Sequence, residues 1–104
     1  MNPQPNPVRG EAAIRVAGEA VVLRPTFAAL VAAEQELGAL FALVERAAEG
    51  RLTLAETVAL FWHCRHEAPQ AVTREAIGEA VVAHGVAACA PVLNTLLRQI
   101  LAGR

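Results

Sequence analysis

Residues 21–38, VVLRPTFAALVAAEQELG, change from a strand pattern to a helix pattern within three positions. The β-branched and apolar run 21–23 is typical of a half-buried strand. Pro25 cannot extend a strand ladder, Thr26 has the hydroxyl of a helix N-cap, and Gly38 suits the position that ends a helix. The stretch therefore predicts a strand joined directly to an amphipathic helix over residues 26–37. One face of that helix is expected to carry Phe27, Leu30, Val31, Glu34 and Leu37.

The residues before this junction predict a β-hairpin preceded by an arm. Residues 1–10 contain three prolines among Asn and Gln, a composition that cannot build a core, so we expect a flexible N-terminal arm. Two short apolar runs then flank Gly18, which supplies the positive φ that a tight turn needs. We expect a hairpin over residues 11–24, with its apolar face laid on helices because a lone hairpin is marginal in water.

The rest of the chain has the pattern of short helices with clear starts and stops. Thr53 and Glu56 have the spacing of a capping box, Thr73 is a second N-cap, and Pro91 is expected to start or kink the last helix. The predicted helices cover residues 39–49, 53–66, 73–84 and 86–102. With room for one core, residues 11–104 are expected to form a single α+β, mostly α domain, a hairpin packed on a bundle of four to five short helices.

The residue types that are missing limit the possible chemistry. The 104 residues contain no Ser, Asp, Tyr or Lys. A serine nucleophile, an aspartyl dyad, a Schiff-base lysine, a P-loop lysine and Asp-based magnesium or calcium sites are therefore impossible within this chain. We expect a protein that is not an enzyme and that has no cofactor and no small-molecule substrate.

Charge and hydropathy bear on partners and location. Ten Glu against nine Arg give a net charge of −1, and no basic block offers the footprint expected for nucleic acid. No window reaches the roughly 18 uninterrupted apolar residues of a membrane span, and the polar, proline-rich start does not resemble a signal peptide. The expectation is a protein of the bacterial cytoplasm that binds neither nucleic acid nor membrane.

Histidine and cysteine side chains gather late in the chain. His63, Cys64 and His66, with His84 and Cys89 further on, are of the types that zinc prefers. The spacing argues against a metal site, because His63 and His66 could share a helix face while Cys64 points elsewhere, and no C-x-x-C or H-E-x-x-H is present. We predict no metal and two reduced, partly buried cysteines.

Charged residues near the junction have simple structural interpretations. Glu34 and Glu36 are two residues apart on a helix and so lie on different faces, which excludes an acid–base pair. Glu34 is expected to pair with an arginine such as Arg46. Arg24 is suited to binding a phosphate or carboxylate, or more simply to being solvated or salt-bridged.

The last predicted helix has an apolar stripe wider than a small core needs. Either this helix is central to the fold, or part of it is left for a partner. The candidate partner-binding residues are Leu93, Leu96, Leu97, Ile100 and Leu101.

Several segments together resemble a known family. They are N-P-x-R-G-E at residues 6–11, L-R-P-T-F-A-A-L at residues 23–30, E-G-x-L-T-L-A-E at residues 49–56 and T-x-E-x-I-G-E-A at residues 73–80. In order and spacing they resemble the small tail-assembly proteins of gene transfer agents and related phage-like particles of alphaproteobacteria, labelled either tail tube or tail assembly chaperone. The chain departs from the expected pattern at residues 63–69, where a glycine-containing link would be expected.

The resemblance implies a non-catalytic role in the assembly of a particle, including particles encoded by prophages. It implies a tail assembly chaperone that binds the tape-measure protein, or another tail protein, and keeps it soluble until the tube polymerises, with a possible homo-oligomer. The alternative is a structural tail tube component. A regulatory DNA-binding module ranks lower, because the helix predicted over residues 73–84 has only Arg74 beside Glu75 and Glu79.

Overall fold

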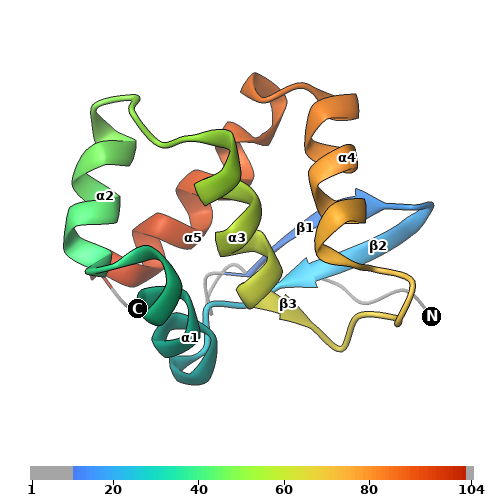
Figure 1. Cartoon of the computed structure of the whole chain (residues 1–104), viewed down its shortest axis with the longest axis horizontal. Helices are drawn as coiled ribbons and strands as arrows, with labels where there is room; N and C mark the ends of the chain where they lie inside the picture. The colour runs from blue at the N-terminus through green and yellow to red at the C-terminus, as the bar shows by residue number, and fades with distance from the viewer. Residues whose placement is uncertain (1–10, 103–104) are drawn as a thin grey trace.

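The computed structural model describes residues 11–102, which fold as an α+β domain, as the sequence predicts (Figure 1). The predicted N-terminal arm, residues 1–10, and residues 103–104 of the predicted domain lie outside the described residues. The elements in chain order are β1 (Ala12–Val16), β2 (Glu19–Leu23), α1 (Phe27–Leu37), α2 (Leu40–Ala48), α3 (Leu54–Cys64), β3 (Arg65–His66), α4 (Arg74–His84), the 3₁₀ turn η2 (Ala87–Cys89) and α5 (Ala90–Ala102).

The first two strands form the predicted antiparallel hairpin. Ile14 lies opposite Val21, and Val16 lies opposite Glu19. The two turn residues, Ala17 and Gly18, have φ values of 51° and 81°, which is the backbone of the tight turn that matches the right-handed twist of a hairpin.

The junction into α1 follows the sequence prediction at both ends. The Thr26 hydroxyl accepts a hydrogen bond from the Ala29 amide at 3.1 Å, and the Gly38 amide donates to the Glu34 carbonyl at 2.9 Å, with Gly38 at φ 88°. Gly38 therefore ends the helix in a backbone conformation that few other residues adopt.

The predicted apolar face of α1 is wrong in part. Phe27 is 85% exposed and Val31 is 36% exposed, whereas Ala33 is fully buried. The side of α1 that packs on the core carries Ala29, Leu30, Ala33 and Leu37, and α1 contacts α3 at the edge of the domain (Figure 1).

The predicted helix over residues 53–66 stops two residues early. The capping box is present, since the Thr53 hydroxyl accepts from the Glu56 amide and the Glu56 carboxylate accepts from the Thr53 amide. At the other end, Arg65 turns to extended geometry and β3 pairs with β2, which gives a three-stranded antiparallel sheet. The Arg24 amide donates to the Cys64 carbonyl at 2.7 Å, so the edge of β2 captures the chain as it leaves the helix.

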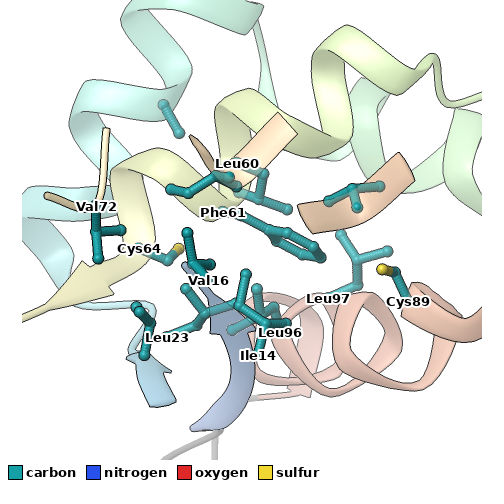
Figure 2. Close-up of a cluster of buried hydrophobic side chains, with 14 of the residues drawn as sticks. Ile14, Val16, Leu23, Leu60, Phe61, Cys64, Val72, Cys89, Leu96 and Leu97 are labelled. Carbon is teal, nitrogen blue, oxygen red and sulfur yellow. The ribbon is translucent and has the colours of Figure 1, made fainter. Parts of the chain in front are cut away.

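The core lies between α3, the hairpin and α5. Figure 2 shows Phe61 and Cys64 of α3 among side chains from Val16, Leu23 and Leu96. The hairpin therefore lays its apolar face on the helices, as expected for a sheet this small. The same cluster of buried side chains also includes Ile14, Leu60, Val72, Ile77, Val81, Cys89 and Leu97.

Candidate protein-binding groove

An open groove of about 930 Å³ runs between α3 and α4 and reaches the C-terminal end of α1. Its lining is mostly apolar in the middle and charged at the edges. The lining residues are Glu36, Leu37, Leu54, Ala55, Glu56, Val58, Arg74, Glu75, Gly78, Glu79, Val82 and Ala83.

The apolar part of the groove comes from facing turns of the two helices. A Cβ atom added to Gly78 would lie 3.9 Å from both methyl carbons of Val58, so the glycine forms the part of the floor where α4 meets α3. Val82 and Leu54 flank this contact and remain 63% and 44% exposed. Exposed apolar side chains that line one hollow indicate a binding surface rather than scattered surface residues.

One edge of the groove is held by an ion-pair cluster that joins three elements. The Glu36 carboxylate of α1 accepts from the His63 ring at 2.8 Å and from the Arg74 guanidinium of α4. The hydrogen bonds from Arg74 and His63 hold the pKa of Glu36 below its usual range. The carboxylate is thus ionised at neutral pH and ties α1 and α3 to the first turn of α4.

The remaining rim is acidic. Glu56 is occupied by its own helix cap and by Arg46, and hydrogen bonds from Thr53 and Arg46 hold its pKa below the usual range. Glu75 and Glu79 are exposed on α4, and no ion pair to either is seen within residues 11–102. Four glutamates and one arginine among the described residues line the groove, so its rim has a net negative charge.

The leucines proposed for partner binding on α5 divide between core and surface. Leu96 and Leu97 are buried, with 0% and 7% of their surface exposed. Leu93 and Ile100 are half-buried and pack against the core, and Leu101 is 57% exposed. Partner binding by α5 therefore stays a prediction only for its exposed end, because the buried leucines are already used in the fold.

The histidines and cysteines are dispersed by the fold. His63 pairs with Glu36, whereas His66 lies on β3 and not on the helix face predicted for it. Cys64 and Cys89 are free and buried, and burial raises the pKa of the Cys64 thiol to about 12. Within residues 11–102, no group of three His, Cys, Asp or Glu side chains is placed to hold a metal ion.

Arg24 is salt-bridged, which is one of the two interpretations offered by its sequence position. Its Nε donates to the Glu11 carboxylate at 2.6 Å, and the Glu11 side chain is only 3% exposed. Its Nη1 lies 3.2 Å from Nε2 of His66, which must accept because a guanidinium only donates. This cluster holds the start of β1, the end of β2 and β3 together.

Glu34 does not pair with Arg46, contrary to the prediction. Its carboxylate accepts from the Leu40 amide at 3.2 Å and so satisfies the first turn of α2, while Arg46 pairs with Glu56 at 2.6 Å. Ala39 at the start of α2 has no side chain that could cap the helix, so a carboxylate from the preceding helix does so instead.

The sequence did not reveal the groove. Ile77 and Val81 of α4 are buried, as their spacing predicts, and the adjacent Val82 faces outward. Two features of the sequence could have indicated the groove: Gly78 in the middle of a helix, and Val82 next to the buried Val81. Neither feature shows which other helix forms the opposite wall of the groove.

No helix in residues 11–102 is by itself both long and apolar enough to cross a membrane. Two helix pairs meet the length and composition requirement only when taken together across bends of 78° and 108°: α1 with α2, and α4 with the segment from Ala87 to Ala102.

The chain matches a known protein family along nearly its whole length. No curated protein and no solved structure matches the chain. A family model described as phage tail tube protein, GTA-gp10, matches residues 9–103, which is nearly the whole chain. The chain therefore belongs to this family of tail proteins from phages and gene transfer agents.

Proposed function

We propose that this chain is a non-catalytic tail assembly chaperone of a gene transfer agent or phage-like particle, acting in the bacterial cytoplasm. Its partner is the tape-measure protein, which it binds during assembly of the tail. Membership of a tail protein family supports binding to other tail proteins. The observation that carries the chaperone role is the apolar groove between α3 and α4.

The groove supports the chaperone role through its accessibility. A chaperone for a long helical protein must cover apolar helix faces that have not yet found their final partners, and such faces bind by lying in a groove. Leu54 and Val82 offer exposed apolar surface for this purpose. The groove is already formed in a single copy of the chain, so binding requires no refolding.

A structural role in the tail tube is the second candidate, and the family description favours it over the chaperone role. The size of the sheet argues in the other direction. A tube subunit is expected to contribute extended sheet to a closed ring, whereas the strands described here have five, five and two residues. Assembly of the purified chain with itself into rings or tubes would favour the structural role.

The experiment is co-expression with the tape-measure protein of the same gene cluster, followed by co-purification and measurement of the mass of the complex. We expect a soluble complex with several copies of this chain on each tape-measure protein, and an insoluble tape-measure protein when it is expressed alone. Absence of association, together with rings or tubes of the purified chain, would overturn the chaperone proposal.

A further inference from the structure

We propose that the groove between α3 and α4 binds an α-helix with an apolar face flanked by arginine or lysine. This inference rests on the proposed function, because it states the chemistry of the partner segment. The partner is a different protein and not a second copy of this chain.

The groove requires a bound segment whose backbone hydrogen bonds are already formed within the segment itself. Its walls are the helices α3 and α4, and neither offers a strand edge to an extended peptide. A bound segment must therefore arrive with its amides and carbonyls already paired, and an α-helix does so.

The polar groups around the groove do not form a small-molecule site. Such sites combine an apolar pocket with a few polar groups that converge on the ligand. Here Glu36 and Arg74 bond each other, and Glu56 is used by the α3 cap and by Arg46. The lining thus offers an apolar floor for side chains with charge at the margin only.

The negative charge at the edge of the groove determines which kind of helix it binds. Glu75 and Glu79 are exposed on the first two turns of α4, beside the apolar floor, and no basic partner for them is seen among the described residues. An apolar helix with acidic flanks would place like charges beside these carboxylates, whereas arginine or lysine flanks complement them. Arg74 does not cancel this preference, because it is paired with Glu36.

The test uses two synthetic 18-residue amphipathic peptides with the same leucine stripe, one with lysine flanks and one with glutamate flanks. Each is titrated into the ¹⁵N-labelled full chain and followed by NMR. We expect the lysine peptide to shift amide signals of α3 and α4, to bind at least about tenfold more tightly than the glutamate peptide, and to weaken as salt is added. Equal binding of the two peptides, or shifts confined to other elements, would overturn the proposal.

Amino-acid substitutions test whether the lysine peptide binds in the groove. Val82→Glu should lower the affinity for the lysine peptide by about tenfold or more, while Val86→Glu should leave it unchanged, because Val86 is similarly exposed, at 59%, but does not line the groove. The double variant Glu75→Lys and Glu79→Lys should reverse the preference between the peptides. Retention of the original preference in the double variant would contradict the assigned role of the rim.

The outcome is separable from the fate of the proposed function. If the lysine peptide fails to bind although the tape-measure protein co-purifies, the groove chemistry is wrong and the chaperone role stands. If the peptide binds in the groove although no tape-measure protein co-purifies, the chaperone role fails and the groove chemistry stands. Self-association that is abolished by Val82→Glu would show that a second copy occupies the groove and would overturn this inference.

Discussion

At the scale of single residues, the most deeply buried ion pair within residues 11–102 is that of Glu11 and Arg24. Glu11 is almost fully buried, whereas the Arg51–Glu49 pair lies in solvent, with 67% and 58% of the side chains exposed. Loss of Arg24 removes a charge-assisted hydrogen bond from a buried carboxylate, whereas exposed pairs contribute little. The two pairs therefore have very different energetic weight despite similar distances.

We predict that Arg24→Met lowers the free energy of unfolding by about 1.5–3 kcal/mol, because a hydrogen bond to a buried carboxylate is lost. Arg51→Met is the matched control, and its effect should stay within about 0.5 kcal/mol. Urea denaturation followed by circular dichroism measures both. Equal effects of the two substitutions would contradict the structural importance given to the buried pair.

Residue-level reasoning from the sequence succeeded where the cause is local. The caps at Thr26, Thr53 and Thr73 were predicted because each hydroxyl reaches an amide only three residues away. The pairing of Glu34 with Arg46 was wrong because both side chains found partners set by the packing of whole helices. Spacing in the sequence holds no information on that packing.

At the scale of elements, two glycines have opposite roles. Gly78 lies inside α4, and an added Cβ would make an ordinary contact with Val58. Gly38 ends α1 at φ 88° and ψ −168°, a region that side chains strongly disfavour. One glycine is thus a weak point within a helix, whereas the other is required by the backbone.

We predict that Gly78→Ala raises the free energy of unfolding by about 0.5–1 kcal/mol, since alanine favours the helix. Gly38→Ala should lower it by about 1–3 kcal/mol, although nothing lies within 4 Å of its added Cβ. Thermal denaturation of the two variants gives the signs directly. A destabilised Gly78→Ala variant would mean that α3 and α4 cannot accept a methyl group at their contact.

The boundaries of elements that depend on contacts with other elements could not be predicted from the sequence. The residues of β3 read as the last turn of a helix, and only the free edge of β2 makes them a strand. Likewise, the exposed Phe27 belongs to a helical apolar pattern, but the neighbouring elements pack on another side of α1, the one that carries Leu30, Ala33 and Leu37. The secondary-structure propensity of a segment predicts little where contacts with a neighbouring element determine its conformation and burial.

At the scale of the whole molecule, the fold depends on α5 as part of its core. Leu96 and Leu97 contact the cluster around Phe61, and α5 also packs on β1 (Figure 2). The sequence had left open whether the last helix is central or available to a partner. The structure makes its buried face central, and the groove lies elsewhere, between α3 and α4.

We predict that Leu97→Glu unfolds the domain or destabilises it by about 3 kcal/mol or more, because an unpaired charge enters the core. Leu101→Glu, on the same helix at an exposed position, should change the free energy of unfolding by about 0.5 kcal/mol or less. Circular dichroism and gel filtration distinguish the two. A folded Leu97→Glu variant that has lost binding to the tape-measure protein would instead support a partner surface on α5.

The packing of β1 against α5 sets the order in which this domain matures on the ribosome. The first strand and the last helix are separated by most of the chain, yet they share one core. The hairpin is therefore synthesised early, and although α3 and α4 also pack on it, its apolar face is fully covered only once α5 has emerged. Before that moment the nascent chain exposes the part of its core surface that α5 will cover, and a pause in translation ahead of α5 would prolong that exposure.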